Sequence, residues 1–354
     1  MTISFDENPY YPIIRSRPAE LLGYSNLKSE EKDALLPLIT LGAWPRAEGL
    51  TESMSHIQSA VDKRPFILDL TRETAYQASE VRTLLNDDGD FSAWRAYALA
   101  IENSIPVVQI KDTKIPRVVK QAKAFTDAGR QVAFRITDFA NDVSKVTAAL
   151  AALPSAESAI IFVDAGYIRD AYQATAIACI DVINEIREDF EDSIICLASS
   201  SFPASVVAFA EPESGGKRGL LQILERPFHQ ALGGNDVCIY GDHSSIHAKV
   251  YPTTGGRFSC RIDYPLFDSW AFERQTDKKS DGYVDCAQAL IATYPEIQEQ
   301  DTWGARAIQN ASIGQIDGMK TPAMWIAARV NMHISRQLSL SLSSDEGDEE
   351  DDIF

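Results

Sequence analysis

Eight short apolar runs, separated by segments of helical character, constrain the fold of this 354-residue chain more than any other feature. The runs lie at residues 10–16, 34–41, 65–70, 105–110, 131–136, 159–164, 193–199 and 236–242. Apolar runs that alternate with helices are typical of buried parallel strands in βαβ units. Because eight such units fill about 235 residues, the pattern predicts an α/β fold with a (β/α)8, TIM-barrel-like body.

An open, doubly wound parallel sheet is the alternative arrangement of the same units. Many open sheets bind a dinucleotide at a Gly-rich turn directly after the first strand. No Gly-rich turn of that kind follows residues 10–16. We therefore favour the barrel.

The pattern divides the chain into three predicted parts. Residues 8–243 form the barrel domain, in which residues 220–232 are expected to be a helix. Residues 244–338 form a β-hairpin, at 257–264 and 268–274, and a helical extension packed on the barrel. Residues 339–354 are Ser-rich and then acidic, a composition that predicts a disordered tail.

Composition and charge exclude several classes of protein. No run reaches the roughly 20 apolar residues of a membrane span, and the N-terminus has no signal-peptide pattern, so we expect a cytoplasmic protein. The net charge of −18 argues against direct nucleic-acid binding through phosphates. The five cysteines form no Cys-x-x-Cys pair and are expected to be free and buried.

Polar residues end most of the apolar runs, and in a barrel the C-terminal strand ends meet at one mouth, where barrel enzymes place their sites. Arginines and carboxylates together can bind an anion and transfer protons. The catalytic candidates are Asp69, Asp164, Asp242 and Arg135, and the ligand-binding candidates are Arg15, Arg17, Gln109, Arg135, Ser201 and Tyr240.

A divalent metal is the one cofactor that these residues predict. Asp69, Asp164 and Asp242 would supply the oxygen ligands that magnesium or calcium prefers. Alternatively, the charges form a structural ion-pair network at the barrel top. His243 and His247 are four residues apart, but no third His or Cys is close in sequence, which favours loop histidines.

Several short motifs are similar to one known family. They are Tyr11-Pro12-Ile13-Ile14-Arg15-Ser16-Arg17-Pro18-Ala19-Glu20-Leu21, Leu36-Pro37-Leu38-Ile39, Asp164, Ser201-Phe202-Pro203, Tyr240-Gly241-Asp242 and the Trp325, Asn331, His333 helix. Over residues 10–338 the chain resembles the phage-type "beta protein" family. That resemblance implies a protein of phages or of bacterial mobile and anti-phage defence loci, and carries no settled activity. The family often has Lys where Arg15 stands and Tyr where His243 stands; a guanidinium does not deprotonate, so Arg15 cannot serve as a titratable lysine.

The C-terminal residues Asp351, Asp352, Ile353 and Phe354 provide a second resemblance. They are similar to the tip of bacterial single-stranded DNA-binding proteins, an acidic run followed by Ile-Pro-Phe, although the proline is missing here. A terminal Phe carboxylate can enter an apolar pocket beside basic residues while the acids steer its approach. This predicts a protein partner with such a pocket, for example a DNA-processing or nuclease-like protein; the alternative is a solubilising tail.

These features support three hypotheses of function. The first is a phage- or defence-associated barrel protein that acts in a complex through its charged mouth and its tail. The second is a barrel enzyme, a metal-assisted hydrolase of a phosphorylated or nucleic-acid-derived substrate. The third is an acidic DNA mimic that inhibits a DNA-binding enzyme.

Overall fold

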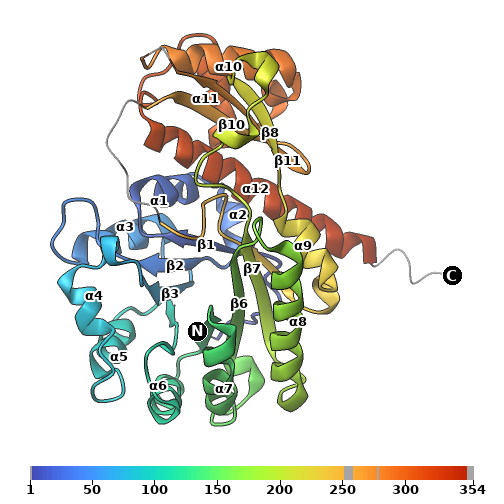
Figure 1. Cartoon of the computed structure of the whole chain (residues 1–354). Helices are drawn as coiled ribbons and strands as arrows, with labels where there is room; N and C mark the ends of the chain where they lie inside the picture. The colour runs from blue at the N-terminus through green and yellow to red at the C-terminus, as the bar shows by residue number, and fades with distance from the viewer. Residues whose placement is uncertain (1, 251–257, 277–278, 349–354) are drawn as a thin grey trace.

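A parallel sheet of eight strands forms the body of the computed structural model, which describes residues 2–250, 258–276 and 279–348 (Figure 1). The sheet order is β4-β3-β2-β1-β9-β7-β6-β5. A parallel bridge between Val107 and Ala133 joins the two edge strands, so the sheet is a nearly closed barrel. The predicted barrel class is thus confirmed. The strands are β1 (Tyr11–Arg15), β2 (Leu38–Leu41), β3 (Phe66–Leu70), β4 (Ser104–Pro106), β5 (Val132–Ile136), β6 (Ala159–Tyr167), β7 (Ile194–Ser200) and β9 (Ile239–Asp242).

Helices cover the outside of the barrel (Figure 1). They bury one apolar face each; in α6, for example, Val118, Ala122 and Phe125 recur at helical spacing and are all buried. The helices of this layer are α1 (Pro18–Ser25), α2 (Ser29–Asp33), α3 (Thr51–Val61), α4 (Ser79–Leu84), α5 (Ser92–Leu99), α6 (Ile115–Asp127), α7 (Phe139–Leu150), α8 (Tyr172–Asp189) and α9 (Glu225–Ala231). Short 3₁₀ helices are η1 (Thr74–Tyr76), η2 (Ala156–Ser158), η3 (Val207–Phe209), η4 (Pro212–Ser214) and η5 (Gly234–Asp236).

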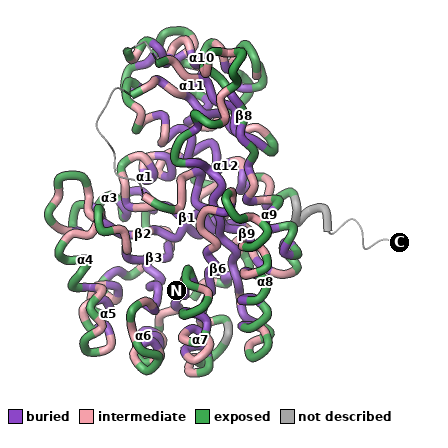
Figure 2. The backbone as a smooth tube through the Cα atoms, in the orientation of Figure 1, coloured by how far each residue is buried: buried purple, intermediate pink, exposed green. Residues whose placement is uncertain are grey.

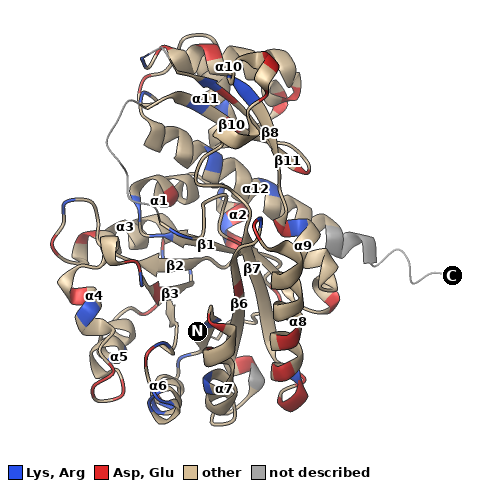
Figure 3. Ribbon diagram, viewed as in Figure 1, with Lys and Arg blue, Asp and Glu red and all other residues tan. Residues whose placement is uncertain are grey.

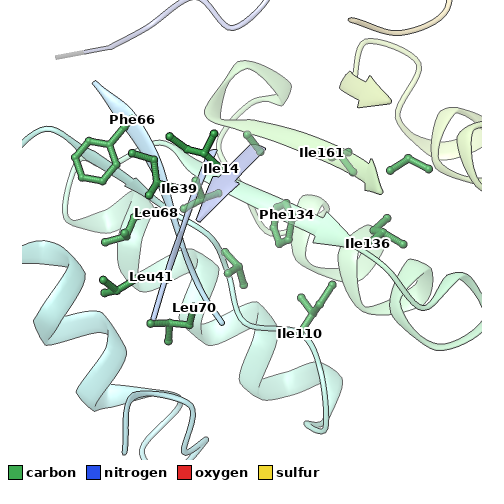
Figure 4. Close-up of a cluster of buried hydrophobic side chains, with 14 of the residues drawn as sticks. Ile14, Ile39, Leu41, Phe66, Leu68, Leu70, Ile110, Phe134, Ile136 and Ile161 are labelled. Carbon is green, nitrogen blue, oxygen red and sulfur yellow. The ribbon is translucent and has the colours of Figure 1, made fainter. Parts of the chain in front are cut away.

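The strands are buried on both faces, which explains their nearly continuous apolar sequences (Figure 2). Alternate residues point to opposite faces. Ile14, Ile39, Leu68, Phe134 and Ile161 pack outward in the core beneath the helices (Figure 4). Their neighbours, among them Ile13, Leu38, Ile67, Ala133 and Phe162, form the separate core inside the barrel.

A second unit lies above the barrel (Figure 1). It contains an antiparallel sheet of order β10-β11-β8, in which β10 (Cys260–Pro265) and β11 (Ser269–Gln275) are the hairpin that the sequence predicts. Its helices are α10 (Gly282–Thr293), η6 (Pro295–Glu299), α11 (Trp303–Ser312) and the first half of α12 (Pro322–Asp348).

The third strand of that sheet, β8 (Arg218–Gln222), corrects the prediction of a helix from residue 220. The helix that follows, α9, starts only at Glu225. Exposed and buried residues alternate along the five residues of β8, as expected of a strand with one buried face. This alternation is short, and it overlaps residues 220–232, which were predicted to be helical.

Helix α12 joins the two units because its two halves pack in different cores. Trp325, Ala328 and Met332 are buried in the second unit, whereas Ile334 and Leu338 are buried against the barrel. No helix in residues 2–250, 258–276 and 279–348 is long and apolar enough to cross a membrane. All five cysteines are free and buried, as predicted.

Helix α12 also corrects part of the prediction that residues 339–354 are disordered. It continues to Asp348, so residues 339–348 are helical, and residues 349–354 lie outside the described part. Arg226 of α9 holds this end in place: its Nη2 donates to the Gln337 carbonyl and to Ser341 Oγ, both at 2.6 Å. A tertiary contact thus stabilises a segment whose composition favours disorder.

Candidate functional site in the barrel mouth

A cavity of about 530 Å³ opens at the C-terminal ends of the barrel strands. Five of its lining residues come from inward positions near those ends: Arg15 of β1, Thr40 of β2, Asp69 of β3, Arg135 of β5 and Asp164 of β6. They form a polar layer directly above the apolar interior core. A cavity of this volume is within the range of small-molecule sites.

Arg135 lies at the centre of this polar layer. Its Nε and Nη2 donate to Asp164 Oδ2 at 2.9 and 2.7 Å, and its Nη1 donates to Asp69 Oδ2 at 3.0 Å and to Thr40 Oγ1 at 3.1 Å. Burial alone would lower the pKa of Arg135, but the two carboxylates outweigh burial and raise it. The guanidinium is therefore occupied, and it orients two carboxylates rather than binding a free anion.

His243 forms the second contact of Asp164. Its Nε2 lies 2.8 Å from Asp164 Oδ1, and both side chains are almost completely buried. Burial would raise the pKa of Asp164, but His243 and Arg135 hold it well below its usual range. An ionised carboxylate only accepts hydrogen bonds, so Nε2 of His243 carries a proton and donates it to Asp164.

The other ring nitrogen of His243 is open to a ligand. His243 lines the cavity, and no residue of the described chain hydrogen-bonds to its Nδ1. A histidine whose second nitrogen is held by a carboxylate is the usual arrangement of a general base.

Gln109 extends the network toward the rim. Its Nε2 donates to Asp69 Oδ1 at 3.1 Å, and its Oε1 accepts from Arg72 Nη2 at 3.0 Å. Burial lowers the pKa of Arg72. Gln109 therefore lies in the mouth, as predicted, and links the inner carboxylate to a rim cation.

Arg15 also lies in the mouth, but its polar atoms are used by the protein itself. Its Nη2 donates to the carbonyls of His247 and Ala248 at 2.7 Å, and its backbone N–H donates to Glu20 Oε2 at 2.7 Å. The His247 ring stacks on Tyr167 with centroids 4.2 Å apart. Arg15 thus anchors the segment after β9 across one side of the mouth.

Asp242 and Tyr240 lie outside the mouth, contrary to the prediction. Asp242 is fully buried on the outward face of β9, where it accepts from Tyr10, Tyr240 and the Ser244 N–H and contacts His333 of α12. Asp69, Asp164 and Asp242 therefore do not converge, and the predicted metal triad is not formed. Across the described residues no group of three or more His, Cys, Asp or Glu side chains is placed to hold a metal ion.

Two further ligand-binding candidates, Ser201 and Arg17, do not line the mouth cavity and make contacts within the fold instead. Ser201 binds Glu225 at the start of α9: its Oγ donates to Oε2 and its N–H to Oε1, both at 2.6 Å. The guanidinium of Arg17 lies over the Tyr76 ring, 4.5 Å from its centroid. The partner-binding candidates Asp351, Asp352, Ile353 and Phe354 lie outside the described residues.

Sequence comparison places this architecture in a family. The family model described as Beta protein matches residues 10–339. The chain belongs to the Beta protein family. A curated member, Protein beta of Enterobacteria phage P4, is 41% identical over 355 aligned residues, which cover 99% of each protein. The resemblance drawn from the short motifs is therefore confirmed, and the barrel mouth described above is that of a Beta protein.

Proposed function

We propose that the barrel mouth of this Beta protein is an acid–base active site for a small polar substrate, with His243 as the proton carrier. The observation that supports this function is the His243–Asp164 pair, 2.8 Å apart, on the wall of a cavity of about 530 Å³. A purely structural ion-pair layer needs neither a histidine nor an open cavity above it.

Each residue of the network has a role in this proposal. Nδ1 of His243 accepts a proton from the substrate, and Asp164 stabilises the imidazolium that forms. Arg135 is a positioning residue, because its Nε and Nη2 both donate to Asp164 Oδ2, which holds this carboxylate and keeps it ionised.

The rim of the cavity indicates the kind of substrate. Arg72, Lys111 and Lys249 line it, and Lys111 forms no ion pair with any residue in the described ranges. Glu73 and Asp170 lie on the same lining. A substrate with an anionic substituent beside neutral polar groups fits this rim.

Untargeted metabolite profiling tests the activity on many candidate substrates at once. Wild-type protein is incubated with a bacterial small-molecule extract, and consumed and formed species are measured by mass spectrometry. His243→Gln should abolish the change, whereas the control His56→Gln, on an exposed residue stacked on Trp44, should retain it. Equal conversion by wild type and His243→Gln would refute the proposal.

We also propose that the protein acts with a protein partner through its C-terminal residues. The support is the sequence of Asp351, Asp352, Ile353 and Phe354 together with helix α12, whose described part ends beyond α9 (Figure 1). Tagged wild type and a variant lacking residues 349–354 are compared in affinity purification from phage-infected cells. A partner recovered by both proteins in equal amounts would refute the role of these residues.

The DNA-mimic hypothesis gains no support from the charge distribution. Figure 3 shows both acidic and basic residues on the helices around the barrel, with acidic residues gathered at the lower end of α8. A mimic would require carboxylates at regular, phosphate-like spacing.

A further inference from the structure

A second cavity, of about 490 Å³, shares no lining residue with the mouth. It lies between the segment after β7, the β10–β11 hairpin, α10 and the first turn of α12. Two features of its lining indicate a ligand: an arginine pair whose charge is only partly compensated, and an aromatic wall.

The arginine pair is formed by Arg261 of β10 and Arg274 of β11. The two residues are directly opposite each other in the antiparallel register, and both line the cavity. Like charges in opposite positions of a sheet destabilise it unless an anion lies between them.

The protein supplies only part of the neutralising charge. Arg261 Nε lies 3.0 Å from Asp263, but that carboxylate is shared with the buried Arg329, 2.8 Å away. The one side-chain hydrogen bond of Arg274 is a long one, 3.4 Å to Ser259 Oγ, and no carboxylate of the described chain forms an ion pair with it. Arg261 and Arg329 therefore share one carboxylate, and Arg274 pairs with none in the described residues.

Tyr283 forms part of the apolar wall. The residue lines the cavity, and its side chain, including the hydroxyl, is completely buried.

The remaining wall is apolar and aromatic. Trp325 stacks on Tyr283 with ring centroids 5.3 Å apart. At the rim, Val207 and Phe258 are 58% and 51% exposed. The lining thus offers an apolar surface beside two cations.

We propose that this cavity binds an apolar or aromatic molecule that carries a carboxylate or phosphate group. The anionic group lies between Arg261 and Arg274, and the apolar body packs on Trp325 and Phe258. This site is independent of the proposed acid–base chemistry of the mouth.

The ligand has two possible sources: a small aromatic anion, or the C-terminal Ile353-Phe354 carboxylate of a second copy of the chain. The chain's own C-terminus cannot reach the cavity. Along α12, Asp348 lies 22 positions after Ile326, a distance of about 33 Å. The six residues that follow span at most about 21 Å.

Calorimetric titration of the full chain tests the proposal with phenyl phosphate, inorganic phosphate, benzyl alcohol and a synthetic peptide of residues 345–354. Phenyl phosphate should bind at least tenfold more tightly than phosphate or benzyl alcohol, because only it carries both parts. Arg274→Gln should weaken its binding at least tenfold, and Arg274→Lys should restore part of it. Arg306→Gln, on the exposed face of α11, should bind as wild type does.

The controls separate the two cavities and the two sources. His243→Gln should leave phenyl phosphate binding unchanged, since it alters only the mouth. Peptide binding that is lost in Arg274→Gln identifies the chain end as the source, and binding of phenyl phosphate alone identifies a small molecule. Arg274→Gln removes a like-charge contact, so its urea midpoint should not fall below that of wild type. Equal phenyl phosphate affinity in wild type and Arg274→Gln would overturn the proposal.

Discussion

Asp242 offers a direct test of how the barrel is joined to α12. Its carboxylate is 0% exposed and lies between Tyr10 and Tyr240 of the barrel and His333 of α12. The substitution Asp242→Asn keeps the size of the side chain and removes only the charge and one acceptor. It therefore isolates the contribution of the buried carboxylate to the junction.

The magnitude follows from the pKa of Asp242. Burial acts to raise it, but His333 and the hydrogen bonds from His333, Tyr10 and the Ser244 N–H lower it from 3.8 to about 2. A difference of this size corresponds to about 2 kcal/mol of folding free energy. Because the folded-state pKa is the lower one, this stabilisation is fully present above about pH 4 and is lost as the pH falls through about 2.

Urea unfolding measures the prediction, with tryptophan fluorescence as the probe. Trp270 stacks on His333 with centroids 5.4 Å apart, so its emission reports on this junction. At pH 7 Asp242→Asn should lower the free energy of unfolding by about 2–4 kcal/mol, since charged hydrogen bonds are lost as well. At pH 3 the difference from wild type should be about 1 kcal/mol smaller.

The control is Asp317→Asn, in which an exposed carboxylate paired with Lys320 is neutralised. It should leave the urea midpoint unchanged at both pH values. A difference for Asp242→Asn below about 0.5 kcal/mol at pH 7, or one that stays constant down to pH 3, would refute the reasoning.

Three further predictions concern other contacts of the fold. Asp164→Ala leaves the buried Arg135 with Asp69 as its one carboxylate partner, so the free energy of unfolding in urea should fall by about 3–5 kcal/mol. The surface control Asp317→Asn should leave it unchanged. Gly23→Ala should lower the free energy of unfolding by about 1–3 kcal/mol in the same assay, because the new Cβ would lie 2.6 Å from the Ala327 carbonyl oxygen of α12. Gly129→Ala should lower it less, since a Cβ there has open space around it and only the φ of +75° is unfavourable. Arg226→Ala should increase amide hydrogen exchange in residues 337–343 and not in α6; unchanged exchange there would contradict the role of Arg226 in holding α12.

The eight barrel strands were predictable because each is an apolar run buried on both faces. Alternation with helices is common to barrels and open sheets, and closure was favoured by the eight units and by the lack of a Gly-rich turn after the first strand. The bridge between Val107 and Ala133 completes the closure. The strand β8 was not predictable in the same way. Its partners, Ser269–Glu273 of β11, are about 50 residues later in the chain, so the short alternating pattern has no local support.

The end of α12 shows a second limit of composition. Serines and acids after Leu338 reduce the apolar content below that of a typical surface helix. What stabilises this segment up to Ser341 is Arg226, more than 100 positions earlier in the chain. Contacts of such high sequence separation leave no local pattern.

The most consequential difference concerns the last barrel strand, where the necessary signal was present in the sequence. Side chains of a strand alternate between its faces, and a shift of one position moves a residue from the mouth to the outer wall. Ile239 packs toward the barrel interior, so Gly241 and His243 share its face, whereas Tyr240 and Asp242 face α12. The sequence prediction assigned the last polar residue of this run, Asp242, to the mouth. It therefore grouped Asp242 with Asp69 and Asp164 as a metal triad. Alternation instead selects His243, which lies beside Asp164, and the proposed proton transfer rests on this pair.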